Sequence, residues 1–137
     1  MSALCEHLAY DIDDDARIVT VVYIGDVRDD EVIDFYVDLH AQRPDVVTCD
    51  YLLDMRYTDW RASQEMIARL RIVFSREQVN ARRRLAIVRK SDAMVNKVQE
   101  AVLREGLDWR SIRYFSQMGQ ARDWLLLSEP DGWRTRV

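Results

Sequence analysis

Metal-binding and redox-active side chains are scarce in this chain of 137 residues. It contains two cysteines and two histidines, and Cys5 and Cys49 lie too far apart to form a pair with metal-ligand spacing. We expect both cysteines to be free thiols. The glycine patterns of phosphate loops and of serine hydrolases are absent too. The sequence therefore predicts no catalytic residue, no metal ligand and no cofactor, and we expect a protein that is not an enzyme.

Long apolar runs are also missing. None approaches the ~18 residues that a membrane span needs, and the N-terminal segment lacks the basic and apolar regions of a signal peptide. The net charge of −4 argues against nucleic acid as the partner, because phosphate binding needs a clustered basic face. We expect a cytoplasmic protein with an ordinary globular composition, 48% apolar and 32% charged.

Strands and helices alternate along the chain. Runs of β-branched and aromatic residues indicate strands, and apolar residues at helical spacing indicate helices. The predicted strands are 8–13, 17–25, 46–55, 85–88 and 111–115. Helices are predicted from Asp29 or Asp30 to before Pro44, over about 62–80, from Ser91 to Gly106, and over 117–127.

This order predicts an α/β fold. The first two strands form an antiparallel hairpin around Asp13–Asp15, and the later strands are parallel because helices separate them. We expect a single domain over 1–137, with a core at about 8–127 and a loosely held tail at 128–137. Its five-stranded mixed sheet and four helices follow the order ββαβαβαβα.

The third predicted helix carries an apolar stripe that we expect to face the core. The stripe consists of Met94, Val95, Val98, Ala101 and Val102.

Polar side chains gather where two predicted strands end. One end contributes Asp54, Arg56, Tyr57, Asp59, Trp60 and Ser63, and the other contributes Arg89, Lys90 and Ser91. Ligands of open α/β sheets usually bind outside the carboxyl ends of parallel strands. If these two strands are neighbours, their loops form one rim that could hold a small anion or an acidic strip of a partner. The alternative is that Arg56 pairs with Asp54 or Asp59, and that Trp60 only covers a helix start.

Several stretches resemble the SpoIIAA-like (STAS) superfamily. They are the strand Arg-Ile-Val-Thr-Val-Val-Tyr-Ile-Gly at 17–25, the helix start Asp-Asp-Glu-Val-Ile at 29–33, Leu-Leu-Asp-Met-Arg at 52–56 and the closing Tyr-Phe-Ser-Gln-Met-Gly-Gln-Ala-Arg-Asp-Trp-Leu at 114–125. The resemblance covers about 8–127 and is strongest to stand-alone, poorly characterised bacterial members. It implies a SpoIIAA-like fold and a non-enzymatic regulatory role similar to that of anti-sigma factor antagonists.

In the regulatory members of that superfamily, a strand ending in Leu-Asp precedes an Asp-Ser pair at a helix start. A partner kinase phosphorylates the serine, which breaks the complex. Here Leu53-Asp54 match the strand end and the family spacing leads to Ala62-Ser63, so the serine is present without its acidic neighbour. The resemblance thus implies Ser63 as a candidate phosphorylation site, where a phosphate would repel an acidic partner. The alternative is a serine that only caps the helix.

Three classes of function follow. The first, implied by the resemblance, is a protein-interaction module that contacts a regulatory partner through the Tyr57–Ser63 loop and the following helix, so that Trp60→Ala weakens binding and leaves the fold intact. The second is a binding protein for a small apolar or anionic molecule between helices and sheet, which its ligand would stabilise against heat. The third is a homodimer, favoured if the tryptophans are exposed.

Overall fold

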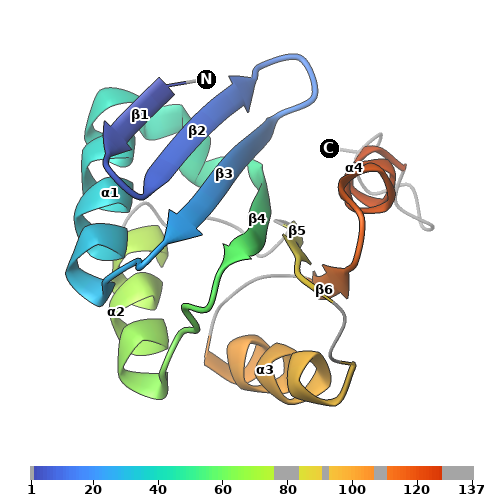
Figure 1. The fold of residues 1–137 in the computed structure, drawn as a ribbon. Helices are drawn as coiled ribbons and strands as arrows, with labels where there is room; N and C mark the ends of the chain where they lie inside the picture. The colour runs from blue at the N-terminus through green and yellow to red at the C-terminus, as the bar shows by residue number, and fades with distance from the viewer. Residues whose placement is uncertain (1, 76–83, 91–92, 107–110, 128–137) are drawn as a thin grey trace.

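The computed structural model describes residues 2–75, 84–90, 93–106 and 111–127. Figure 1 shows strands of one sheet with helices around them. The elements, in chain order, are β1 (Ser2–Cys5), β2 (Leu8–Asp13), β3 (Ile18–Gly25), α1 (Asp29–Gln42), the 3-10 helix η1 (Pro44–Thr48), β4 (Asp50–Thr58), α2 (Gln64–Ser75), β5 (Arg84–Val88), α3 (Ala93–Gly106), β6 (Ser111–Phe115) and α4 (Met118–Leu126).

The described strands form one mixed sheet in the order β1-β2-β3-β4-β5-β6. β1, β2 and β3 pair antiparallel, and β3, β4, β5 and β6 pair parallel. The five predicted strands and four predicted helices all occur in the predicted order, so the mixed α/β prediction is confirmed. β1 is an addition that the sequence did not predict, because four residues are too few to show alternation. The predicted tail, 128–137, lies outside the described residues.

The two faces of the sheet carry different layers. Alternate residues of a strand point to opposite faces, so Val19, Val21 and Tyr23 of β3 face α1 and α2, where the larger core lies. On the other face, Ala121 and Leu125 of α4 pack in a smaller core with residues of β4 and β5. Among the described helices, α4 is the one that covers this second face, and Figure 1 shows it beside β5 and β6, away from β2. On this face α4 reaches the start of β3, where Ile18 joins the smaller core, and Arg122 of α4 pairs with Asp13 at the end of β2.

The predicted strand 46–55 is wrong at both ends. Pro44 starts η1, in which Val46 and Val47 are buried without joining the sheet. β4 begins at Asp50 and continues to Thr58, so its last residues extend into the stretch predicted as a loop. Asp54 consequently lies inside the strand and not at its end. An apolar pair in a 3-10 turn cannot be distinguished from a buried strand segment by composition.

The start of α1 also differs from the prediction. Arg28 is the N-cap, and its backbone N–H donates to Glu31 at 3.0 Å. Asp29, Asp30 and Glu31 form the acidic first turn that the helix dipole favours. Neither aspartate is the N-cap. Asp29 accepts a hydrogen bond from the Trp60 indole N–H, and Asp30 forms an ion pair with Arg69.

The predicted inward stripe of α3 is wrong except at Val102, which is partly buried and packs against the larger core. Met94 is 78% exposed and Val98 is 61% exposed, and Ala101 is also exposed. The helix instead turns Gln99 and Leu103, which are four residues apart and share a face, toward the interior. Apolar residues occur around more than half of this helix, so periodicity alone did not fix the buried side.

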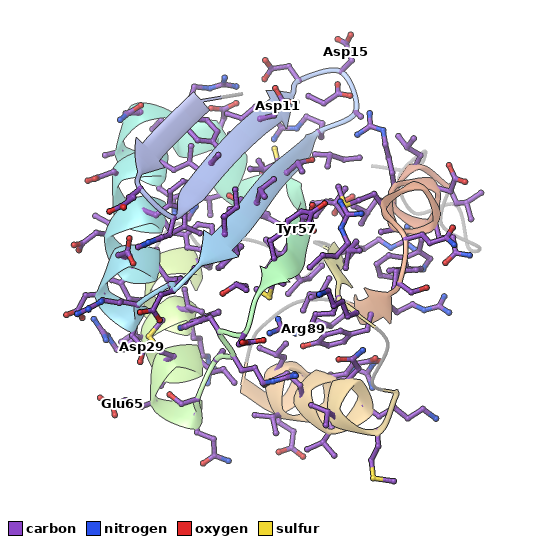
Figure 2. All side chains as sticks on the ribbon, in the orientation of Figure 1. Asp11, Asp15, Asp29, Tyr57, Glu65 and Arg89 are labelled. Carbon is purple, nitrogen blue, oxygen red and sulfur yellow. The ribbon has the colours of Figure 1, made fainter. Side chains whose placement is uncertain are left out.

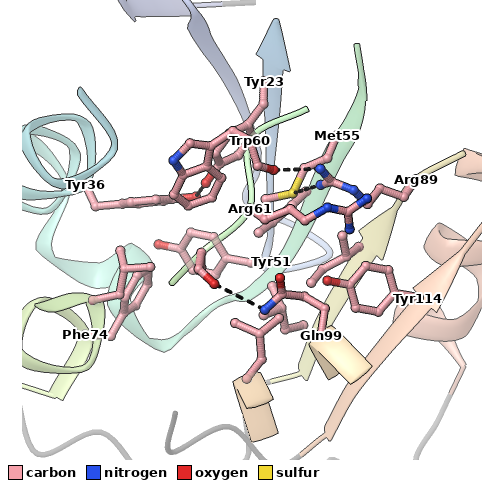
Figure 3. A pocket seen from close by; sticks show the side chains of 16 residues that line it. Tyr23, Tyr36, Tyr51, Met55, Trp60, Arg61, Phe74, Arg89, Gln99 and Tyr114 are labelled. Atoms are coloured by element: carbon pink, nitrogen blue, oxygen red, sulfur yellow. Dashed lines mark hydrogen bonds between the residues drawn. The ribbon is translucent and has the colours of Figure 1, made fainter. Parts of the chain in front are cut away.

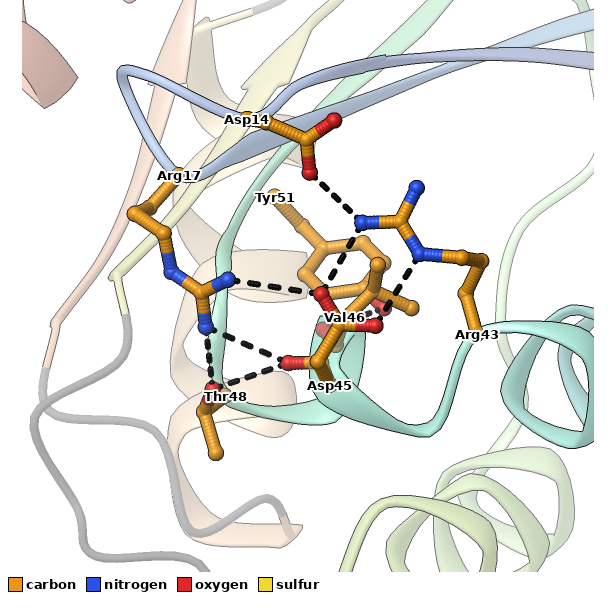
Figure 4. Close-up of polar contacts among 7 residues, drawn as sticks. All are labelled: Asp14, Arg17, Arg43, Asp45, Val46, Thr48 and Tyr51. Carbon is orange, nitrogen blue, oxygen red and sulfur yellow. Dashed lines mark hydrogen bonds and ion pairs between the residues drawn. The ribbon is translucent and has the colours of Figure 1, made fainter.

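Charged side chains fasten the β2–β3 turn to η1 (Figure 4). Arg43 donates to Asp14 at 2.5 Å and to Asp45 at 2.9 Å. Arg17 donates to the Asp45 carbonyl at 3.2 Å and to Thr48 at 2.6 Å. The hydrogen bonds from Arg43 lower the pKa of Asp45 and raise that of Arg43. The turn is thereby attached to the chain segment that leads into β4.

This network makes stability sensitive to acid, and Arg43→Met tests it. The carboxylate pKa is lower in the folded protein, so the ion pairs contribute above the unfolded value of about 3.9 and their contribution is lost as pH falls through the folded value. We expect Arg43→Met to lower the urea midpoint at pH 7, and we expect the midpoints of the variant and the parent protein to converge below about pH 4. Lys97→Met, an exposed change on α3, is the control. A difference that does not vary with pH would contradict this account.

Candidate functional site

Three parallel strands end side by side and form the rim that the sequence predicted. Thr58 at the end of β4 lies opposite Gly25 at the end of β3, and Asp54 lies opposite Val88, the last residue of β5. Figure 2 shows Tyr57 and Arg89 at these neighbouring strand ends. Gly25 has φ +78°, a conformation that favours glycine, and the chain turns away from the sheet there.

An open cleft of about 770 Å³ lies over these strand ends. The predicted site residues that line it are Arg56, Tyr57, Asp59, Trp60 and Arg89. Lys90, predicted as part of the rim, lines it as well. Asp54 and Ser63 lie near the cleft without lining it, and Ser91 lies outside the described residues.

Asp54 and Arg56 neutralise each other. Asp54 is 3% exposed, and Arg56 donates to its two carboxylate oxygens at 2.9 and 2.8 Å in a bidentate pair. The hydrogen bonds to Asp54 raise the pKa of Arg56. The pairing considered as the alternative for Arg56 is therefore present, and Arg56 is not a free cation for a ligand.

Trp60 packs against the protein with most of its ring. It stacks on Tyr23 with ring centroids 5.6 Å apart and an interplanar angle of 23°. Its indole N–H donates to Asp29 at 2.8 Å, and its backbone N–H donates to Thr58 at 3.1 Å. Trp60 thus connects the loop after β4 to the first turn of α1, and the aromatic side chain that stands exposed at the rim is Tyr57, at 55%.

Ser63 caps α2. Its hydroxyl oxygen accepts the Met66 N–H at 3.1 Å, and its carbonyl accepts the Ile67 N–H at 2.9 Å. This is the N-cap geometry considered as the alternative. The side chain is exposed, so phosphorylation of Ser63 stays a prediction.

Arg89 is the unusual residue of the cleft. It is 5% exposed, yet none of the described residues forms an ion pair with it. Its guanidinium donates to the Trp60 carbonyl at 2.6 Å and to the Met55 sulfur at 2.9 Å. Burial lowers its pKa and the nearby Arg61 lowers it further, while Tyr114 and the Asp59 carboxylate, which does not form an ion pair with Arg89, act weakly in the opposite direction. Because a guanidinium has five N–H donors, Arg89 keeps donors and a full charge without a counter-ion.

A cavity of about 50 Å³ lies behind Arg89, between the sheet and helices α2 and α3 (Figure 3). Met55, Trp60, Arg61 and Arg89 line both this cavity and the open cleft. The remaining walls are mainly aromatic and aliphatic. They include Tyr23, Tyr36, Tyr51, Leu53, Leu85 and Leu103.

Sequence reasoning missed Arg61, Gln99 and Tyr114 as parts of this site. Gln99 donates to the Ala62 carbonyl at 3.3 Å and joins α3 to the loop before α2. Burial raises the pKa of Tyr114 to about 12. Tyr114 lies on β6, which pairs with β5, so applying the strand-end rule to β6 as well would have found it.

The described ranges contain no group of three or more His, Cys, Asp and Glu side chains that could hold a metal ion. Cys49 is free and buried, as the sequence predicted, and burial raises the pKa of its thiol. Among the helices of these ranges, none combines the length and apolarity needed to cross a bilayer.

Sheet order and cleft together define a small α/β domain whose site lies at the carboxyl ends of its parallel strands. The chain belongs to the SpoIIAA-like family, whose model matches residues 18–126, so the predicted resemblance is confirmed. Its structure is similar to the crystal structure of an uncharacterized protein from the DUF3478 family, with a SpoIIAA-like fold, from Shewanella loihica PV-4. The two share 16% identity at a TM-score of 0.63, over 91% of this chain and 98% of the other. That likeness concerns the fold. A search of curated proteins finds no match.

The packing of Trp60 changes the expected result of Trp60→Ala. Removing a half-buried indole from a stacked pair leaves a void, so we expect a loss of about 2–3 kcal/mol in unfolding free energy by urea denaturation. Tyr57→Ala, at the exposed aromatic of the same rim, is the control and should change stability by less than about 0.5 kcal/mol. Equal stability of the two variants would show that the Tyr23–Trp60 stack contributes little.

Proposed function

We propose that this chain is a non-enzymatic binding domain for a small anion, with Arg89 as the anion-binding residue. The observation that carries the proposal is the burial of Arg89 at the cleft without a carboxylate partner among the described residues. This observation favours the second class of function expected from the sequence, a binding protein for a small molecule, over the first, a protein-interaction module.

A buried charge without a partner is costly, because water no longer solvates it. An anion in the cleft would offset that cost, and this favours anion binding at Arg89. Arg61 and Lys90 add positive charge to the cleft walls, and Arg56 adds none because Asp54 neutralises it. Asp26 and Asp59 also line the cleft. Because these carboxylates offset the added positive charge, the cleft is not a broad basic surface, and Arg89 is its central contact for an anion.

Arg89→Met tests this function, with acetate and inorganic phosphate as probes in NMR titrations of the backbone amides. We expect the parent protein to bind at least one of these anions and the variant to bind neither. Since methionine removes an unpaired buried charge at similar length, the unliganded variant should be at least as stable as the parent protein in urea.

Lys90→Met is the matched control, because Lys90 lines the same cleft but is exposed. It should keep the anion affinity of the parent protein within about threefold, as expected for an exposed charge. Anion binding that survives Arg89→Met would contradict the assignment, and so would a parent protein that binds neither probe.

A protein-interaction module is the second candidate, and one observation favours it. Ile24 and Tyr57 face each other in the β3–β4 register and are 48% and 55% exposed. They lie near the carboxyl ends of β3 and β4, next to the loop that the sequence predicted as the contact region. Exposed paired apolar side chains suit a partner surface. A double Ile24→Ser, Tyr57→Ser variant separates the candidates, because it should lose a protein partner and keep acetate binding.

A further inference from the structure

We propose that the cavity behind Arg89 holds the short apolar tail of a monocarboxylate whose head group pairs with Arg89. The inference rests on the proposed anion-binding function and names the class of ligand. It follows from three features: the continuity of cleft and cavity, the charge of the mouth and the chemistry of the walls.

Cleft and cavity meet at one place. Met55, Trp60, Arg61 and Arg89 line both spaces, and Figure 3 shows Arg61 and Arg89 on one side of the cavity, with Tyr114 beside Arg89 and Tyr36 on the opposite side. A ligand whose head lies against the Arg89 guanidinium therefore has its next atoms directed either out to solvent or into the cavity. The apolar walls favour the second path for a hydrocarbon tail.

The mouth suits a single negative charge. The planar guanidinium of Arg89 can give two parallel N–H bonds to one carboxylate, and it still has donors beyond those used by Met55 and Trp60. The buried Arg89 is balanced by one anion, since the second positive charge of the mouth, Arg61, is accompanied by the negative charge of Asp59 in the cleft. A phosphate dianion would leave an excess charge in the same buried position, which is costly.

The tyrosine hydroxyls of the far walls are already bonded. The hydroxyls of Tyr23 and Tyr36 bond each other at 2.6 Å, and the Tyr51 hydroxyl donates to the Val46 carbonyl at 2.9 Å. The Gln99 amide is engaged with the Ala62 carbonyl. A hydroxyl on a tail that lies against these three rings would lose its bonds to water and find no free hydroxyl there, because the remaining tyrosine of the lining, Tyr114, lies at the head-group end beside Arg89. An unsubstituted hydrocarbon tail fits these walls better.

The size of the cavity limits the length of the tail. A volume of about 50 Å³ has room for about two to four water-sized groups, and methylene and methyl groups are of that size. Butyrate, with three carbons beyond its carboxylate, therefore fills the space. A longer chain would have to displace wall residues, and close-packed walls resist that.

The test is a homologous series of acetate, propionate, butyrate and hexanoate, titrated into the full chain by NMR at fixed pH and ionic strength. We expect affinity to rise about fourfold with each methylene from acetate to butyrate and to gain nothing further at hexanoate. 4-Hydroxybutyrate should bind about tenfold more weakly than butyrate. Contacts between the butyrate methyl group and tyrosine ring protons should appear in nuclear Overhauser spectra.

A cavity-filling variant supplies an independent readout. Leu103→Phe enlarges a wall residue of α3 and should reduce butyrate affinity to the level of acetate while acetate binding stays unchanged. Leu126→Phe, on an exposed position of α4, is the control and should keep the full series. The measurements on the parent protein decide the question even if Leu103→Phe does not fold.

The outcomes separate this inference from the function on which it rests. Equal affinity for acetate and butyrate would contradict the binding of an apolar tail in the cavity and would leave Arg89 as an anion site. Affinity that keeps rising at hexanoate would overturn the size limit and with it the cavity as the tail site. Absence of binding by every member of the series, together with inorganic phosphate, would overturn the proposed function itself.

Discussion

One extra residue in β4 determines the geometry of the cleft. Val22 of β3 lies opposite Asp54, but Ile24, two residues later, lies opposite Tyr57. This bulge changes the alternation of side chains by one position. Tyr57 therefore emerges on the same face as Asp54, where it is exposed, and does not follow Met55 into the core. The chain beyond it is held by the bond from the Thr58 hydroxyl to the Gly25 carbonyl at 2.7 Å, which brings Trp60 onto Tyr23.

The same end of the sheet contains a buried charge that lacks the kind of partner found for other charges of the protein. Elsewhere, buried or half-buried charges have partners, as Asp54 has in Arg56 and Asp13 in Arg122. Arg89 has no ion-pair partner among the described residues, and its guanidinium donates to a sulfur and a carbonyl. Unpaired buried charges persist in natural proteins mainly where function requires them. The cost of this buried charge in stability and the anion binding that we propose would have the same physical origin.

The sequence predicted the order of strands and helices because their apolar patterns are local. It also predicted which loops would meet, since parallel strands end at one edge. It did not predict the bulge in β4, which depends on pairing with β3, nor the buried side of α3, on which apolar residues are spread too widely. Burial of Arg89 was missed because arginine is rarely buried. The cavity was missed because Tyr23, Tyr36 and Tyr51 come from distant segments and look like ordinary core residues.

β1 has a consequence for how the chain can be shortened. It pairs with β2, with Ala3 opposite Ala9, and so occupies the edge of the sheet. A chain trimmed to begin at Leu8, where the apolar patterns first become clear, would leave the β2 backbone with unpaired donors and acceptors along a sheet edge. Such edges recruit strands from other molecules. By pairing with β2, these four residues therefore protect the sheet edge from pairing with strands of other molecules.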